Sequence, residues 1–376
     1  MLKIVAVFGT RPEAIKMAPV VLEMRRRPDI ETIVCVTAQH RGMLDDALNA
    51  FGIRPEHDLN IMRPQQSLWE TNAAVLTQLT PLLVRLRPNR VLVHGDTTTT
   101  YAAAVASFYL GVPVGHVEAG LRTGNLNAPW PEEFNRRSVD IFADLLWAPT
   151  EAAAHNLVKE GARPENVVVT GNTAVDAVVS VRERIERDSL LQETLWRRLP
   201  RLDPGKRLLL VTGHRRESFG GGLVEICEAV SRLAERHDVE IVWPLHANPK
   251  VVGTVGEHLR PSANIHLVDP IEYLAFVALM SRAYLIITDS GGIQEEAPTL
   301  AKPVLVTRNE TERPEAIAAG SARLVGISAQ RIVEAALHLL DDTSAYTEMS
   351  CRRSPFGDGD AAVKIVDSLL LRHGAL

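Results

Sequence analysis

Short runs of apolar, mostly β-branched residues alternate with amphipathic stretches along the whole chain. In the first half these runs predict strands at Ile4–Phe8, Thr32–Thr37, Arg90–His94, Val112–Val117, Leu145–Ala148 and Val167–Thr170. In the second half they predict strands at Leu208–Val211, Glu240–Pro244, Ile265–Val268, Leu285–Thr288, Val304–Val306 and Arg323–Val325. Between the strands the apolar positions follow helical spacing, as at Leu68–Leu86 and Thr97–Leu110. This alternation predicts βαβ units, which build parallel sheets through right-handed crossovers.

The chain of 376 residues is longer than one ordinary hydrophobic core supports. A charged, weakly patterned segment, residues 182–206, separates the two series of strands. We therefore expect an α/β protein with two Rossmann-like, doubly wound parallel-sheet domains that face each other across a cleft. The first domain would span residues 1–172 and the second residues 173–359, and a last helix within residues 360–376 would pack back on the first.

The composition of the chain argues against a nucleic-acid partner, a membrane partner and a disulfide framework. The 41 basic and 46 acidic residues leave a net charge of −5, so no nucleic-acid partner is expected. No window approaches the roughly 20 apolar residues that a membrane span needs, so no membrane partner is expected either. The three cysteines are far apart and odd in number, which predicts no disulfide framework and fits a cytoplasmic location.

Two predicted strands end on a polar corner that carries a carboxylate. Asp96 follows the strand Arg90–His94, and Glu118 follows the strand Val112–Val117. Because the carboxyl ends of parallel strands line one crevice, the two acids should meet at the same edge of the sheet. The alternative for Asp96 alone is that it caps the helix starting near Thr97.

Other corners carry groups suited to an anion. Arg11 and Lys16 follow the first strand near a predicted helix N-terminus, where the alternative is that both are surface charges. Ser290, Gly291 and Gly292 form a strand-to-helix corner that exposes backbone N–H groups, although such a sequence is also an ordinary turn. Glu296 lies one turn into that helix and could accept hydrogen bonds from sugar hydroxyls.

Two further residues have open roles. Glu132 begins a helix after a Pro-Trp-Pro segment, and it is either an N-terminal acid that favours the helix dipole or an active-site acid. His214 follows the first strand of the second half and is a candidate phosphate partner or proton donor. The histidines show no zinc-binding spacing and the first strand lacks a dinucleotide fingerprint, so no metal and no cofactor are predicted.

Several of these segments together resemble the non-hydrolysing UDP-N-acetylglucosamine 2-epimerases of bacteria. The similar segments are VFGTRPEAIK at 7–16, TAQHR at 37–41, HGDTT at 94–98, HVEAGLR at 116–122, GHRRES at 213–218, DSGGIQEE at 289–296 and TERPE at 311–315. They occur in collinear order over essentially the whole chain. The resemblance implies a GT-B fold, a homodimer and interconversion of UDP-N-acetylglucosamine with UDP-N-acetylmannosamine for envelope polysaccharide synthesis.

The resemblance also assigns roles to residues of this chain. It implies Asp96, Glu118 and Glu132 as catalytic acids and His214 as the partner of the leaving phosphate. It implies substrate contacts from Arg11, Lys16, Asp96, Glu118, His214, Ile271, Phe276, Ser290, Gly291, Gly292, Glu296 and Arg313. Family members are often activated by a second substrate molecule near the segment that is Gln39, His40 and Arg41 here. This chain departs from some members at Gly42, where they carry glutamine, and near Gln65, where they carry a basic residue.

The chemistry of such a reaction can be reasoned from the substrate. The C2 proton of the sugar has no neighbouring carbonyl to stabilise a carbanion, so elimination of UDP and its re-addition is the expected route. That route needs a base and an acid on opposite faces and cations at the departing phosphate. A hydrolysing epimerase, a GT-B glycosyltransferase and a nucleotide-sugar sensor are the alternatives that the sequence leaves open.

Overall fold

The computed structural model describes residues 1–39, 41–63, 65–213, 221–351 and 354–373. By its internal contacts the chain divides into two compact units. Unit 1 comprises Met1–Ala177 together with the chain from Phe356 onward, and unit 2 comprises Val178–Pro355. The division falls within helix α7 (Thr173–Arg187).

In the part of the chain that the structure describes, unit 1 is built on a seven-stranded sheet in the order β3-β2-β1-β4-β5-β6-β7. Every pairing in it is parallel. Its strands are β1 (Leu2–Phe8), β2 (Ile30–Val36), β3 (His57–Asp58), β4 (Arg90–His94), β5 (Val114–Val117), β6 (Leu145–Ala148) and β7 (Val167–Val169). The central strand β1 is buried on both faces, because the side chains from Ile4 to Phe8 are fully covered.

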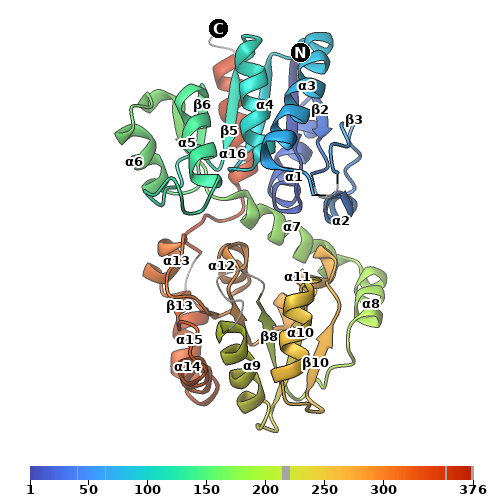
Figure 1. The fold of residues 1–376 in the computed structure, drawn as a ribbon, viewed down its shortest axis with the longest axis vertical. Helices are drawn as coiled ribbons and strands as arrows, with labels where there is room; N and C mark the ends of the chain where they lie inside the picture. The colour runs from blue at the N-terminus through green and yellow to red at the C-terminus, as the bar shows by residue number, and fades with distance from the viewer. Residues whose placement is uncertain (40, 64, 214–220, 352–353, 374–376) are drawn as a thin grey trace. The chain divides into compact units, whose positions relative to one another are not determined.

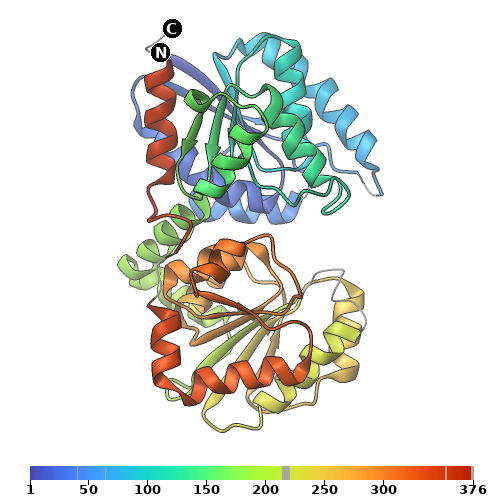
Figure 2. The same ribbon diagram turned by 90° about the vertical axis from the view of Figure 1, so that its left-hand side faces the viewer.

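The helices of unit 1 cover this sheet in two groups. They are α1 (Arg11–Arg26), α2 (Arg41–Phe51), α3 (Leu68–Leu86), α4 (Thr98–Tyr109), α5 (Glu132–Phe142), α6 (Glu151–Lys159) and α16 (Ala361–His373). Helices α3, α4 and α5 pack side by side, while α1 packs against α2 and α16 (Figure 1). Figure 2 shows the red helix α16 on the opposite side of the sheet from the turquoise α4.

The last helix is held on unit 1 by specific contacts. The Asp176 carboxylate accepts a hydrogen bond from the backbone N–H of Ala362 at 2.8 Å, which caps α16. The indole N–H of Trp147 donates to the Ser368 hydroxyl at 2.7 Å, and Arg27 pairs with Asp367 at 2.8 Å. The chain therefore returns to unit 1 after completing unit 2.

Unit 2 has, among its described residues, a six-stranded parallel sheet in the order β10-β9-β8-β11-β12-β13. Its strands are β8 (Arg207–Thr212), β9 (Val239–Pro244), β10 (Ile265–Val268), β11 (Leu285–Thr288), β12 (Val304–Val306) and β13 (Ala322–Leu324). Its helices after α7 are α8 (Ser189–Arg198), α9 (Gly221–Leu233), α10 (Pro249–His258), α11 (Tyr273–Arg282), α12 (Gly291–Glu296), α13 (Pro314–Ala318), α14 (Ala329–Asp341) and α15 (Thr343–Ser350).

The predicted fold class, two doubly wound parallel-sheet units, is confirmed. Five predicted strands match the observed bounds, and the others differ by one or two residues at one or both ends. Strand β3 was not predicted, because it has only two residues, His57 and Asp58, and no apolar run. In each unit the strand order reverses at one point, between β1 and β4 and between β8 and β11. Ligands of open α/β sheets bind outside the carboxyl ends of the strands at such points.

Candidate functional site

Asp96 and Glu118 lie at the carboxyl ends of neighbouring strands in unit 1. Glu118 directly follows β5, and Asp96 follows β4 after the single residue Gly95. The Gly95 N–H donates to the carbonyl of Val117 at 2.9 Å, which ties the two strand ends together. A side chain on Gly95 would place its Cβ 3.8 Å from the Glu118 Oε1 atom. The structure thus brings the Glu118 carboxylate to the residue that precedes Asp96.

Glu118 is held by partners from three other segments. Its Oε2 atom forms an ion pair with Lys16 Nζ of α1 and accepts a hydrogen bond from Asn172 Nδ2 at 3.1 Å. The Nε2 atom of His94 on β4 lies 3.9 Å from the same oxygen. Glu118 also has a φ of +65°, a left-handed conformation that is uncommon outside glycine and often occurs at functional sites. Lys16 and Glu118, predicted as site residues from separate motifs, are therefore in direct contact.

His94 is a neutral imidazole in this cluster. Burial lowers the pKa of His94 to about 4, the charge of Lys16 acts in the same direction, and only the charge of Glu118 opposes them strongly. Among the residues that the structure describes, neither ring nitrogen of His94 has a hydrogen-bond partner. The ring therefore adds no positive charge beside the Lys16–Glu118 pair at neutral pH.

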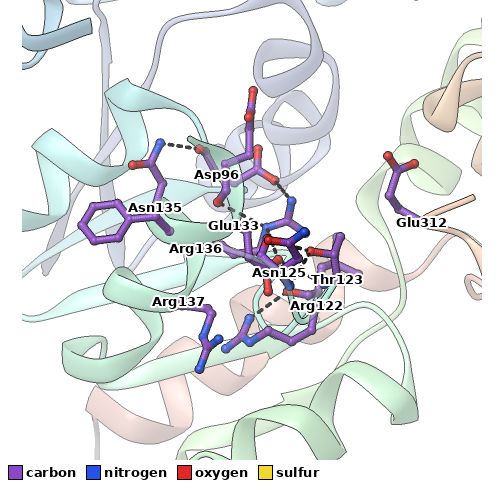
Figure 3. Close-up of polar contacts among 12 residues, drawn as sticks. Asp96, Arg122, Thr123, Asn125, Glu133, Asn135, Arg136, Arg137 and Glu312 are labelled. Atoms are coloured by element: carbon purple, nitrogen blue, oxygen red, sulfur yellow. Dashed lines mark hydrogen bonds and ion pairs between the residues drawn. The ribbon is translucent and has the colours of Figure 1, made fainter. Parts of the chain in front are cut away.

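Asp96 is oriented by helix α5, as Figure 3 shows. Its carboxylate forms an ion pair with Arg136 at 2.9 Å, and its backbone carbonyl accepts a hydrogen bond from Asn135 Nδ2 at 2.8 Å. Arg136 also lies 3.7 Å from Glu133, whose side chain is fully buried. Glu133 accepts the backbone N–H groups of Thr123 and Gly124 at 3.1 and 3.2 Å, which fixes the loop before α5.

Glu132, the other acid at this helix start, is the first residue of α5 and is partly exposed. Its backbone carbonyl accepts a weak hydrogen bond from Arg136 Nε at 3.4 Å. The loop before α5 is tied down by the neighbouring Glu133.

Glu13 is a further carboxylate at this edge, and the sequence motifs did not predict it as a site residue. Its side chain accepts the backbone N–H groups of Gly9 and Thr10 at 3.0 and 2.8 Å. It also accepts the hydroxyls of Thr97 and Thr100 at 2.6 and 3.0 Å. Burial raises the pKa of Glu13, although these hydrogen bonds oppose the rise. Glutamate three residues after Thr10 is a capping-box signal that could have identified it.

Three of the remaining predicted residues of unit 1 are described, namely Arg11, Gln39 and Arg41. Arg11 is the first residue of α1. Gln39 Oε1 accepts a hydrogen bond from Thr99 at 3.4 Å, and Arg41 binds Asp58 and Asn60. His40 lies outside the described residues.

In unit 2 the reversal point carries hydroxyls, backbone N–H groups and the buried Asp289, which directly follows β11. The hydroxyls of Thr212 and Thr288, at the ends of β8 and β11, lie 2.6 Å apart. The Thr288 hydroxyl also accepts the Ser290 N–H at 3.0 Å, and Gly291 and Gly292 open helix α12. His214, predicted to contact phosphate, lies outside the described residues.

The other predicted nucleotide contacts surround this corner. Glu296 is buried and accepts the Tyr273 hydroxyl at 3.2 Å. Arg313 forms an ion pair with the buried Glu295, and its backbone N–H donates to Thr311 at 3.1 Å. Phe276 lies on α11, which begins two residues after Ile271, and is partly buried.

Chemically, the two edges differ in what they can do. The unit 1 edge presents carboxylates paired with Lys16 and Arg136, which suits proton transfer next to a negatively charged group. The Ser290 corner offers backbone N–H groups, which suit an anion. In the described residues, no group of three or more histidines, cysteines, aspartates or glutamates is arranged to hold a metal ion, and no helix is long and apolar enough to cross a membrane.

Comparison with known proteins identifies the family. A family model described as UDP-N-acetylglucosamine 2-epimerase matches residues 22–370. The UDP-N-acetylglucosamine 2-epimerase of Escherichia coli strain K12 is 52% identical over 369 residues, which cover 98% of each chain. The crystal structure of UDP-GlcNAc 2-epimerase from Neisseria meningitidis bound to UDP-GlcNAc is similar with a TM-score of 0.93 and 46% identity, covering 98% of this chain and 100% of that one. The Methanocaldococcus jannaschii enzyme in complex with UDP-GlcNAc and UDP has a TM-score of 0.84 and 30% identity over the same shares. The chain therefore belongs to the UDP-N-acetylglucosamine 2-epimerase family, whose members are isomerases, as its sequence motifs predicted.

Proposed function

We propose that this protein interconverts UDP-N-acetylglucosamine and UDP-N-acetylmannosamine by inverting C2 of the sugar. The observation that carries the proposal is the meeting of Asp96 and Glu118 at adjacent strand ends, with Lys16 paired to Glu118. Family membership supports the substrate, because relatives of known structure were crystallised with UDP-GlcNAc or UDP.

The two units would divide the substrate between them. Unit 1 would act on the sugar through Asp96, Glu118 and Glu132, with Arg11 and Lys16 near the diphosphate. Unit 2 would bind UDP, with phosphate on the N–H groups at Ser290, Gly291 and Gly292 and the ribose on Glu296. The base would lie against Phe276 and the backbone near Ile271, with Arg313 and His214 as further contacts to the nucleotide and its phosphate.

The reaction would proceed by elimination and re-addition. One carboxylate takes the C2 proton while the C1–O bond to the β-phosphate breaks, which gives UDP and 2-acetamidoglucal. UDP then adds back to C1 while an acid delivers a proton to C2 from the opposite face. Cationic side chains stabilise the charge on the departing phosphate. Asp96, Glu118 and Glu132 supply the base and the acid.

The test is turnover of UDP-GlcNAc by the purified full chain in deuterated water, followed by NMR of the anomeric signals. We expect UDP-ManNAc carrying deuterium at C2. Epimerised product without deuterium would overturn the elimination route. Release of free ManNAc would show a hydrolysing enzyme instead, and an unchanged substrate would overturn the proposed function.

The protein is also proposed to be a homodimer that uses helices α4 and α5 of unit 1 as its interface. Large apolar side chains are exposed on these adjacent helices, with Tyr109 77% and Ile141 84% accessible. Phe108 contacts both Tyr109 and Phe142 through its ring, so the group is continuous. Ile141→Lys should convert a dimer to a monomer in light scattering, whereas Leu371→Lys on α16, at a similarly exposed apolar residue, should not. A monomeric unaltered protein would refute the proposal.

A cytoplasmic location and a supply of mannosamine units for envelope polysaccharides complete the proposed function. The cysteines of the chain are unpaired, and Cys35 and Cys227 are buried as thiols, which fits a reducing compartment. Loss of the protein should deplete mannosamine from the envelope polysaccharide of the source cell, measured by sugar analysis. Unchanged mannosamine content would contradict this role.

A further inference from the structure

His116 is a fully buried histidine on β5, two residues before Glu118, and the proposed chemistry does not use it. Its two ring nitrogens make short contacts in opposite directions. Nδ1 lies 2.6 Å from Asp140 Oδ1 of helix α5, and Nε2 lies 2.7 Å from the carbonyl oxygen of Gly95. The ring therefore bridges a carboxylate and the backbone at the corner that carries Asp96.

Both of these partners accept hydrogen bonds. A carbonyl oxygen can only accept, so His116 Nε2 must carry a proton. The second oxygen of Asp140 accepts the Gly120 N–H at 3.2 Å and the Arg122 guanidinium at 2.8 Å, which is the environment of an ionised carboxylate. An ionised Asp140 also only accepts, so Nδ1 must carry a proton as well. A neutral imidazole has one ring proton, and both contacts are satisfied only by the imidazolium.

Four charged side chains lie on the Asp140 side of the ring. Asp140 and Glu160 are negative, and Arg122 and Arg137, which pair with them, are positive, so Asp140 is the carboxylate in direct contact with the ring. On the neighbouring strand, the pKa of His94 is lowered mainly by burial and further by the charge of His116.

The contact to Gly95 fixes the position of Asp96. Gly95 has a φ of +68°, in the left-handed region that glycine adopts most readily. Its N–H is bound to Val117 of β5, and its carbonyl, which belongs to the peptide carrying the Asp96 nitrogen, is bound to His116. Both the N–H and the carbonyl of Gly95 are thus hydrogen-bonded to β5. These two bonds fix the peptide before Asp96 and so fix the direction in which the Asp96 side chain points.

We propose that His116 is a buried imidazolium, held by Asp140, whose Nε2–H anchors the Gly95 carbonyl and thereby positions Asp96 for the proposed epimerisation. His116 is a positioning residue, because it acts through the backbone of Gly95. The inference rests on the proposed function for its role in turnover, but not for the state of the ring.

The ring state is tested by nitrogen NMR of protein labelled at histidine, with His116 assigned by loss of its signals in His116→Gln. We expect protons on both ring nitrogens of His116. In Asp140→Asn the amide oxygen can accept from Arg122 and Gly120 while its NH₂ donates to Nδ1, so one ring proton should be lost and Nε2–H kept. A single ring proton on His116 in the unaltered protein would overturn the proposal.

The anchoring role is tested by a matched pair of variants. In His116→Gln the amide nitrogen reaches the place of Nε2 and still donates to Gly95, whereas in His116→Asn it reaches only the place of Nδ1. We expect kcat to fall about 100-fold in His116→Asn and about 10-fold or less in His116→Gln, with KM nearly unchanged in both. Asp140→Asn, which keeps the anchor, should retain kcat within about 3-fold.

Equal losses of kcat in the two His116 variants would overturn the anchoring role. If His116 served only the stability of the fold, both substitutions would lower kcat to the same extent. If His116→Asn does not fold, a kcat for Asp140→Asn more than about 10-fold below that of the unaltered protein would overturn it too. Absence of turnover in the unaltered protein would instead refute the proposed function, and the ring spectra would still decide the charge of His116.

Discussion

At the reversal point of unit 1, between β1 and β4, charged side chains from several elements meet in pairs. Lys16 binds Glu118 there, and Arg136 binds Asp96. At the corresponding point of unit 2, between β8 and β11, the strand ends carry the hydroxyl pair of Thr212 and Thr288. The corner beyond them, from Ser290, has no side chain larger than a hydroxymethyl group until Ile293. Two sheets with the same winding thus present different chemistry.

The difference follows from where each unit places its ligand-facing groups. Proton transfer needs ionisable side chains at defined positions, and those positions must be fixed by further charged partners. Phosphate binding needs backbone N–H groups with no Cβ in the way, so small residues are sufficient. If the division is correct, changes in unit 1 should act on kcat and changes in unit 2 on nucleotide affinity.

The largest effect is expected from neutralising the acids of unit 1. Asp96→Asn and Glu118→Gln should each lower kcat about 1,000-fold, because a general acid or base typically contributes 10²–10⁴-fold. The loss should appear in both epimerisation and deuterium incorporation, measured by NMR. UDP affinity, measured by calorimetry, should change little if unit 2 binds the nucleotide.

The control for these variants is Glu151→Gln, which removes an exposed carboxylate at the start of α6. It should leave kcat unaltered. Full activity in both Asp96→Asn and Glu118→Gln would refute the assignment of the acids and remove the basis of the comparison.

A second contrast concerns the glycines that follow the first strand of each unit, Gly9 and Gly213. A Cβ on Gly9 would overlap the Thr37 hydroxyl and lie 2.6 Å from that of Thr99, whereas one on Gly213 would lie 3.9 Å from the nearest atom among the described residues. Gly9→Ala should therefore lower the free energy of unfolding by about 3 kcal/mol, and Gly213→Ala should change it by less than about 1 kcal/mol. Urea unfolding measures both.

Equal losses of stability in Gly9→Ala and Gly213→Ala would contradict this contrast. The unit 1 corner would then be no more tightly packed than the unit 2 corner. The hydroxyl pair of Thr37 and Thr99, 2.8 Å apart and buried, is what fills the space beside Gly9.

The sequence predicted the positions of these corners but not their pairings. Apolar runs defined the strands, and a parallel sheet necessarily brings the ends of neighbouring strands to one edge, so Asp96 and Glu118 could be placed together. Lys16 and Glu118 are 102 residues apart, and no local pattern indicates that their side chains meet. Glu13 was detectable through its capping box, whereas the contact between His116 and Asp140 depends on how α5 packs against β5.

Unit 1 should also be the pH-sensitive unit, since burial raises the pKa of both Glu13 and Asp176. Burial raises the pKa of Asp176 from 3.8 to about 6, although backbone N–H groups of α16 oppose it. The pKa of Asp176 is therefore higher in the folded protein than in the unfolded chain. Its protonated carboxyl stabilises the fold below pH ~4, and this stabilisation is lost as the pH rises through about 6. The contribution is at most about 3 kcal/mol.

Asp176→Asn removes this titration and keeps one oxygen for the Ala362 N–H. Urea unfolding at pH 4.5 and pH 7 should show that the unaltered protein loses about 2 kcal/mol more than the variant over this interval. The same loss in both proteins would show that Asp176 does not couple pH to the packing of α16.

The smallest expected effect is on UDP affinity, and it should distinguish the hydroxyl pair of unit 2 from the hydroxyl pair of unit 1. Thr288→Val removes the acceptor for the Ser290 N–H, so the corner proposed to bind phosphate loses its internal support. We expect UDP affinity to fall about 5-fold, equivalent to one hydrogen bond of about 1 kcal/mol, with kcat nearly unchanged. Thr37→Val removes the matching hydroxyl in unit 1 and should leave UDP affinity unaltered in calorimetry. If both substitutions weakened UDP binding equally, nucleotide recognition would not belong to unit 2 alone, and the two corners would have to be treated as parts of one phosphate site.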